Sequence, residues 1–92
     1  MKKRKVIWTQ RAVDSLNKFC EFIAIDSIPA SKKVRKEIIL AAGKLAIHPE
    51  MYQLDELFTD PELNIRRFFR WNYKIVYQVY PKEVVILNVF HT

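Results

Sequence analysis

The apolar residues of this chain change their period from about 3.6 to about 2 near residue 65, and this change restricts the possible folds most strongly. Before that point, two apolar stripes recur at helical spacing. After it, side chains alternate between two faces, as they do in strands. A chain with both patterns must pack helices against a sheet, because each element has one apolar face to bury.

Two helices are predicted from the first half of the chain. The first covers about residues 10–26, with Thr9 at the N-cap position, where its hydroxyl can accept a free backbone N–H. A Ser-Ile-Pro-Ala sequence then marks a stop and a restart, since Pro29 is tolerated in the first turn of a helix. The second helix covers about 30–47 and ends before Pro49, which disfavours helical geometry in the residue before it. Because the connection is so short, the helices form an antiparallel hairpin.

Four strands and one connector complete the prediction. Residues 49–64 are acidic and less regular, with one short turn expected at 55–58. The segment 84–90 is apolar at all but one position and is predicted to be an interior strand. The other strands are expected at Lys5–Trp8, Ile65–Trp71 and Tyr73–Tyr80. The fold class is therefore α+β with the order β-α-α-β-β-β. A helical hairpin covers one face of a mainly antiparallel four-stranded sheet in a single domain of residues 1–92.

The net charge of +6 is unevenly distributed along the chain. Residues 1–49 carry eleven bases against four acids, residues 50–64 carry five acids and no base, and residues 65–92 carry five bases against one acid. A basic body with an acidic connector favours a polyanionic or acidic partner. The alternative is that the positive charge serves solubility alone. The basic run 2–5 is interpreted as a strand lead-in or a phosphate-contacting edge.

Cysteine and histidine usage argues against disulfides and metals. Cys20 is the single cysteine and lies on the apolar stripe of the first helix, where a buried inert thiol is expected. Two histidines and one cysteine far apart in sequence do not form a metal site, and no cofactor is predicted. His48 is expected to interact with the last carbonyls of its helix. No segment has the length of a membrane span, and no secretory signal is recognised at the start of the sequence. Together with the single cysteine, this makes a reducing cytoplasm the expected compartment.

A basic and aromatic surface is predicted where two helices leave one face of the sheet uncovered. Cations can neutralise phosphates and aromatic rings can stack on bases. The residues expected there are Arg66, Arg67, Phe68, Arg70, Trp71, Tyr73 and Lys74. Four of them are assigned to target binding: Arg66, Arg70, Trp71 and Tyr73. Two alternatives remain open: the rings belong to the core, and the arginines form a solvated strand edge that resists aggregation.

The whole arrangement resembles the RelE/ParE toxin superfamily. The resemblance begins with a strand that enters a capped helix at Trp8-Thr9-Gln10-Arg11-Ala12, followed by the Pro-Ala start of the second helix. Its most specific part is Tyr73-Lys74-Ile75-Val76-Tyr77-Gln78-Val79, a short turn and a closing strand that ends at His91. Each motif is weak alone, and their order and spacing together carry the resemblance.

The resemblance implies a toxin of a type II toxin–antitoxin system that a cognate antitoxin neutralises. The antitoxin of such a pair is often acidic and wraps a segment over the toxin, which implies a toxin–antitoxin hetero-oligomer. RelE-like members enter the ribosome and cleave mRNA. ParE-like members poison DNA gyrase and have no established catalytic residues.

The resemblance also implies which residues would cleave RNA if this chain is RelE-like. Such cleavage needs no metal, but it needs cations at the phosphate and a group that exchanges protons. The matching positions are Arg67, Lys74 and His91. Lys74 replaces the usual Arg, which keeps the charge and loses the bidentate fork. The subgroup that includes YoeB ends its last strand in His-Tyr, where this chain has His91-Thr92, and the Arg and Tyr of a C-terminal tail have no counterpart.

These differences from the RelE-like pattern of catalytic residues determine the order of the three functional hypotheses. Gyrase-type, non-catalytic inhibition stands slightly above metal-independent RNA cleavage with Arg67, Lys74 and His91. A toxin remnant that has lost activity and persists as an antitoxin-binding module is the third reading. Whether the chain is an enzyme stays open at this point.

Overall fold

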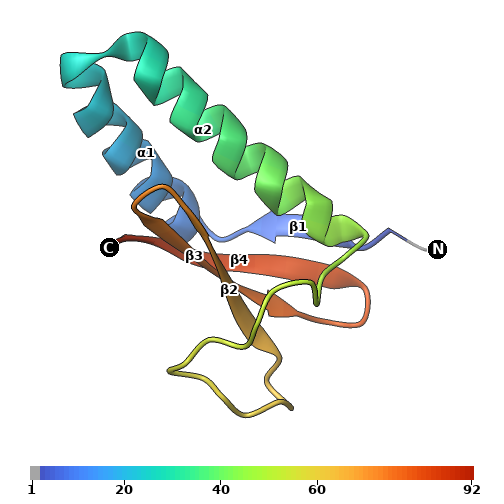
Figure 1. The fold of residues 1–92 in the computed structure, drawn as a ribbon. Coiled ribbons are helices and arrows are strands. Elements are labelled where there is room, and N and C mark those ends of the chain that lie inside the picture. Colours follow the sequence, from blue (N-terminus) through green and yellow to red (C-terminus); the bar gives the residue numbers. More distant parts are fainter. Residues whose placement is uncertain (1–2) are drawn as a thin grey trace.

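A computed structural model describes residues 3–92, so Lys2 of the basic N-terminal run lies outside the described residues. The elements follow the predicted order β-α-α-β-β-β (Figure 1). A short 3-10 helix, η1, follows the second helix. Their bounds are β1 (Lys5–Trp8), α1 (Gln10–Asp26), α2 (Ile28–Gly43), η1 (Lys44–Ala46), β2 (Ile65–Arg70), β3 (Tyr73–Val79) and β4 (Glu83–His91). No helix among residues 3–92 is both long enough and apolar enough to cross a membrane.

The four strands form one sheet in the order β1-β4-β3-β2. β1 runs parallel to β4, while the β4–β3 and β3–β2 pairs are antiparallel, as a mainly antiparallel sheet requires. β4 is an interior strand, as predicted. The β3–β4 pairing passes from Val76–Asn88 to Tyr77–Ile86, so Leu87 has no partner on β3 and forms a β-bulge.

Side-chain caps explain where both helices begin. The Thr9 hydroxyl accepts the Ala12 N–H at 3.1 Å and donates to the Leu87 carbonyl at 3.0 Å, which ties the start of α1 to the bulge. The Ser27 hydroxyl accepts the Ala30 N–H at 3.1 Å. α2 begins two residues earlier than predicted because the cap is Ser27. It ends at Gly43, and η1 tightens the last turn before the proline.

The core lies between the helical hairpin and one face of the sheet. α1 contributes Ala12, Leu16 and Cys20, and the thiol residue is 1% exposed, in agreement with its predicted burial. The strand side of the core consists of alternate residues of β2, β3 and β4: Phe68, Tyr73, Ile75, Tyr77, Val79, Val84, Ile86 and Val89.

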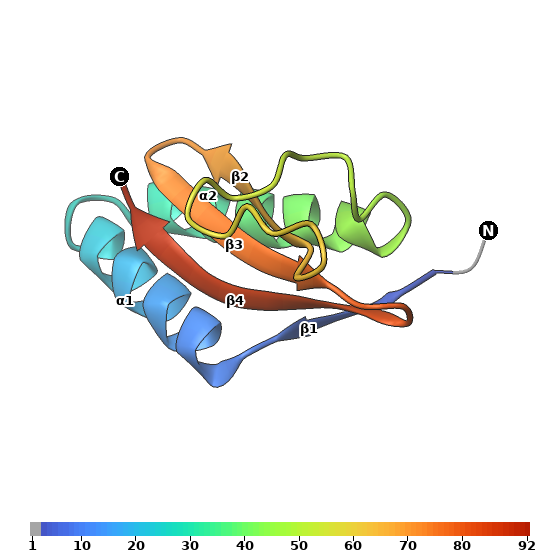
Figure 2. The same cartoon turned by 90° about the horizontal axis from the view of Figure 1, so that it is seen from below.

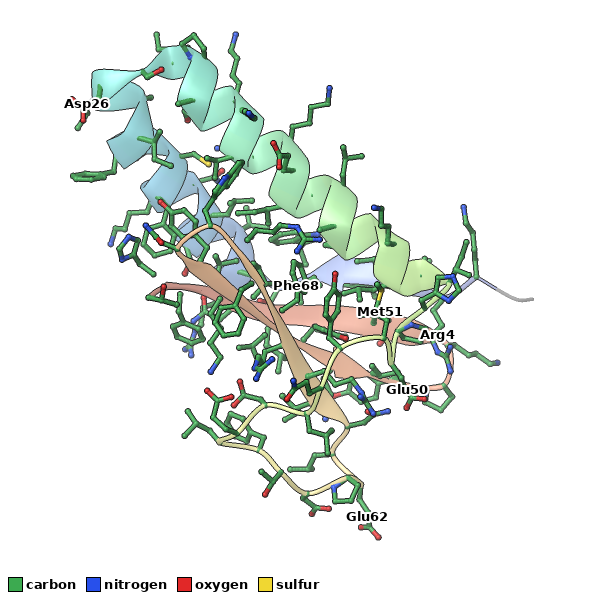
Figure 3. The ribbon with its side chains drawn as sticks, viewed as in Figure 1. Arg4, Asp26, Glu50, Met51, Glu62 and Phe68 are labelled. Carbon is green, nitrogen blue, oxygen red and sulfur yellow. The ribbon has the colours of Figure 1, made fainter. Side chains whose placement is uncertain are left out.

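The connector between η1 and β2 covers part of the other face of the sheet, which we expected to be open. Its residues 53–55 pair with the outer edge of β2, where the Asp55 N–H donates to the Ile65 carbonyl at 2.9 Å and the Arg67 N–H to the Gln53 carbonyl at 3.2 Å. The predicted turn at 55–58 is present, since the Phe58 N–H donates to the Asp55 carbonyl. Figure 2 shows helices behind the sheet and the connector in front of it. Glu62 lies at the far tip of this loop (Figure 3).

Candidate functional site

Arg67 and Lys74 lie on the face of the sheet that the connector partly covers. Lys74 alternates with the buried Tyr73 and Ile75 along β3, so its side chain leaves the sheet on the side opposite the helices. Arg67 is the β2 partner of Val76, two residues from Lys74 on the same face. The structure therefore brings these two predicted residues together.

Asp55 of the connector holds Lys74 in an ion pair. The Asp55 carboxylate is 1% exposed, and its Oδ2 lies 2.8 Å from Lys74 Nζ. Its Oδ1 accepts the Leu57 N–H at 2.8 Å, which shapes the turn. Lys74 Nζ is the partner of the buried Oδ2, for which residues 3–92 provide no other hydrogen-bond donor. The approach of Asp55, and secondarily of Glu56, raises the pKa of Lys74 against the opposing effect of burial.

Glu56 bridges the two cations. Its Oε1 lies 3.2 Å from Lys74 Nζ, and its Oε2 lies 3.3 Å from Arg67 Nε. Its backbone N–H, then Lys74 and Arg67, lower the pKa of this exposed carboxyl from 4.5 to about 2. Both cations of the pair are thus neutralised by the connector.

Arg66 and Arg70 lie on the helix side of β2, with the buried Phe68 between them. Arg66 donates to the Tyr52 carbonyl at 2.6 Å and to Asn64 Oδ1 at 2.8 Å, and its Nη2 lies 3.7 Å from Glu50. Arg70 lies over the Phe68 ring, 5.5 Å from its centroid, and donates to the Tyr52 hydroxyl at 3.3 Å. Within residues 3–92, Arg70 has no carboxylate within 4.0 Å.

The predicted basic and aromatic surface is therefore divided between two faces. Phe68 is 1% exposed and Tyr73 is 7% exposed, so both rings belong to the core, which was the alternative considered for them. Arg67 and Lys74 lie on the opposite face from Arg66 and Arg70 because strand residues alternate. The assumption that all these residues share one open face is wrong.

Trp71 projects from the tight turn between β2 and β3. Its side chain is 50% exposed, and its backbone φ is 51°, a left-handed conformation. A large side chain at positive φ is uncommon and costs about 1–2 kcal/mol. Asn64 has the same φ, but Asn tolerates this conformation. Strain of this kind concentrates at functional sites.

His91 lies on the helix side at the end of β4. Its β3 partner is Tyr73, and its ring meets the Tyr73 ring at 5.3 Å and the Phe19 ring at 6.1 Å between centroids. The three rings line a hollow of about 550 Å³ that extends along the C-terminal half of α1 to Phe22 and Ile23. Among the described residues, no side-chain hydrogen bond or ion pair orients the imidazole.

Two consequences follow for chemistry. General acid–base catalysis requires the proton-transferring group and the phosphate-binding cations to reach one substrate position together. The structure brings Arg67 and Lys74 together and places His91 across the sheet from them. It also occupies both cations with carboxylates, so this arrangement fits ion pairing within the chain rather than a preformed phosphate site.

The acidic partners of the cations on β2 and β3 were not predicted from the sequence. Asp55, Glu56 and Glu50 each contact a cation of β2 or β3. The signal was present, because five acids in 50–64 precede a strongly basic segment. That pattern indicates pairing between neighbouring segments as readily as it indicates an external partner.

Comparison with known proteins agrees with this fold. A family model described as the ParE toxin of the type II toxin–antitoxin system parDE matches residues 6–92. A solved structure of the chromosomal ParDE TA system from P. aeruginosa is similar to the chain, with a TM-score of 0.78 and 18% sequence identity over 98% of this chain and 97% of that one. At this identity the likeness concerns the fold. None of the curated proteins compared with the chain matches it in sequence. Because the family model spans nearly the whole sequence, the chain belongs to the ParE toxins of type II toxin–antitoxin systems.

Proposed function

We propose that this ParE toxin arrests growth by binding DNA gyrase and trapping its cleaved-DNA complex, without cutting nucleic acid itself. The observation that carries the proposal is the separation of His91 from Arg67 and Lys74 by the sheet. A nuclease of the RelE type would need these groups to act on one phosphate.

The ion pairs of Arg67 and Lys74 add a second argument. Each cation already faces a carboxylate at 2.8–3.3 Å, so an incoming phosphate would have to displace Asp55 or Glu56. Preorganised catalytic cations face the position of the reacting group instead. The proposed activity therefore rests on surface contacts.

The β2–β3 turn is the proposed contact with the target. Arg70 and Trp71 are adjacent there, one cation without a carboxylate partner in the described chain and one half-exposed ring in a strained conformation. Arg and Trp are the residue types that most often dominate protein interfaces. Of the other residues assigned to target binding, Arg66 is held by Tyr52 and Asn64, and Tyr73 supports the turn from the core.

The second partner in this proposal is a cognate antitoxin that neutralises the toxin in a hetero-oligomer. Membership in a parDE family implies a paired antitoxin. The chain has a net charge of +6, and an acidic antitoxin would complement it. Purification of the chain with the product of the adjacent reading frame tests this pairing.

A supercoiling assay with purified gyrase and plasmid DNA tests the proposal. In the presence of the wild-type toxin, we expect cleaved DNA that is covalently attached to gyrase to accumulate in the reaction. Trp71→Gly should lose this effect while remaining folded, because Gly adopts positive φ without strain. Leu40→Ser is the control, since Leu40 is an exposed apolar residue of α2 and lies outside the hollow that Tyr73 lines.

The other two readings give different outcomes. Codon-aligned cuts in translated mRNA that disappear in His91→Ala would establish a RelE-like nuclease and overturn the gyrase proposal. Unaffected growth after induction of the unpaired chain would identify an inactive antitoxin-binding remnant.

A further inference from the structure

The net positive charge of the molecule does not lie on the arginine-rich strands β2 and β3, where the sequence led us to expect it. Residues 50–74 carry four bases and five acids, and three of those bases are in ion pairs. Residues 10–43 of the helical hairpin carry six bases and four acids. The excess therefore comes mainly from the remaining segments, whose only acid is Glu83.

The fold gathers these remaining cations at one end of the molecule. The Arg4 N–H donates to the Ala46 carbonyl at 2.8 Å, which joins the N-terminal strand to η1. Arg4 Nε donates to the Tyr80 carbonyl at 3.0 Å, and the Lys5 N–H donates to the Lys82 carbonyl at 3.2 Å. We call this end the basic corner and define it by its cations, Lys3, Arg4, Lys5, Lys44 and Lys82. Figure 3 shows Arg4 beside the C-terminal end of α2.

The cations of the basic corner are available to a ligand. The four lysines are exposed, and none of the five cations has a carboxylate within 4.0 Å in the part of the chain that the structure describes. Glu83 is the Cα partner of Lys5 and makes no ion pair with it. Arg4 is held by its bond to Tyr80, so one guanidinium is already positioned.

We propose that the basic corner binds the phosphate backbone of nucleic acid. A hollow of about 520 Å³ opens there, lined by Lys3, Arg4, Pro81 and Lys82. Three of its four lining residues are cations, which suits a ligand of high charge density. Such contacts neutralise phosphates, release counterions and carry no base specificity.

The same lining argues against an acidic protein segment as the ligand. Protein interfaces take most of their energy from a few buried aromatic or apolar anchors in well-packed pockets. The hollow offers Pro81 alone for that purpose. A repeating phosphate chain needs no such anchor, because its affinity comes from charge neutralisation.

Fluorescence anisotropy of a short labelled DNA duplex of mixed sequence tests the proposal. The test variant carries Lys3→Gln, Lys5→Gln and Lys82→Gln, and it leaves Arg4 in place because Arg4 bonds to the backbone of the β3–β4 turn. The control carries Lys32→Gln, Lys33→Gln and Lys36→Gln, which removes the same charge from exposed positions of α2. Circular dichroism melting checks that both variants are folded.

We expect the wild-type chain to bind the duplex with an affinity that falls steeply between about 50 and 200 mM salt. The corner variant should bind about tenfold more weakly at the lower salt, and its log–log salt slope should fall by about 2. The control should change the affinity by no more than about twofold. Unlabelled duplex should displace the probe far better than poly-glutamate at equal charge.

Three results would overturn the proposal. The first is no binding by the wild-type chain at low salt, and the second is an equal loss in both triple variants, which would indicate net charge alone. The third is equal displacement by poly-glutamate, which would assign the corner to an acidic protein. Because no gyrase is present, each of these results leaves the proposal about gyrase standing.

Discussion

At the scale of single residues, the Asp55–Lys74 pair decides whether the connector stays on the sheet. Asp55 is almost completely buried, and the side chain of Lys74 is 15% exposed. A buried carboxylate that loses its partner is costly because its charge is left uncompensated and poorly solvated. The pair also fixes the turn that presents Glu56 to Arg67.

Lys74→Met should therefore destabilise the fold by about 2–4 kcal/mol, toward the lower end because water reaches part of the pair. Lys74→Arg is the matched control and should lose less, since it retains a cation. Urea unfolding monitored by tryptophan fluorescence measures both free energies. Equal stability of wild type and Lys74→Met would contradict the role assigned to Asp55.

The lowered pKa of Glu56 predicts that the stability of the fold depends on pH in the acid range. Its pKa is lowered in the folded chain, so the stabilisation it provides is complete above its unfolded value of 4.5 and is lost as the pH falls toward about 2. The wild-type unfolding midpoint in urea should fall across this window. Glu56→Gln should show a shallower fall, and an identical pH profile for the two proteins would rule out the bridge.

At the scale of elements, local chemistry determines the helices, and contacts distant in sequence determine the connector. Thr9 predicts the start of α1, and the Ser-Ile-Pro sequence predicts the start of α2 to within two residues, because a cap acts within its own first turn. The pairing of 53–55 with β2 follows no such rule, since its hydrogen bonds join residues about a dozen positions apart. This is why the strands and helices could be predicted and the covered face could not.

The helix caps give a prediction at this scale. Ser27→Ala should cost about 1 kcal/mol, because one N–H of α2 loses its acceptor. Thr9→Ala should cost up to about 2 kcal/mol, since the Thr9 hydroxyl also bonds to the bulge at Leu87. Thr9→Ser keeps both bonds and serves as the control. Thermal melting followed by circular dichroism measures the differences, and a Thr9→Ala protein as stable as Thr9→Ser would refute the assignment.

The β2–β3 turn gives a second prediction at the scale of elements, which concerns the strain at Trp71. Trp71→Gly should keep or raise stability, by up to about 1 kcal/mol, because it relieves the positive φ. Trp71→Val should lower the stability by about 1 kcal/mol, since branching at Cβ increases the steric strain at positive φ. Melting temperatures that rank Val above Gly would show that the turn is not strained.

At the scale of the whole molecule, the sheet separates two sets of residues that the sequence presents as one. Period-2 alternation correctly placed Arg67, Tyr73 and Lys74 on strands, and the family resemblance placed His91 at the end of the closing strand. Trp71 was expected at the end of a strand and lies in the turn after β2. The face that each residue occupies also depends on what covers it. His91 and Tyr73 face α1, while Arg67 and Lys74 face the connector. The candidate site could therefore be listed from sequence, but its division could not.

The buried phenols predict loss of the fold in alkali. The Tyr77 hydroxyl donates to the Pro49 carbonyl at 2.8 Å, and burial raises its pKa well above the ordinary 10.0; burial also raises that of Tyr73. Stability from these neutral phenols is complete below about pH 10 and is lost as the pH rises further. Phenolate absorbance and circular dichroism should change together. Tyr77→Phe, about 1 kcal/mol less stable at neutral pH, should show a shallower alkaline loss.

The most direct test of non-catalytic gyrase poisoning is the recovery of covalent gyrase–DNA complexes from cells that express wild type or His91→Ala without antitoxin. We predict the same yield of complexes and the same growth arrest from both chains, because His91 lies across the sheet from the other candidate residues. Growth arrest without gyrase–DNA complexes, accompanied by mRNA cuts that vanish in His91→Ala, would contradict the account.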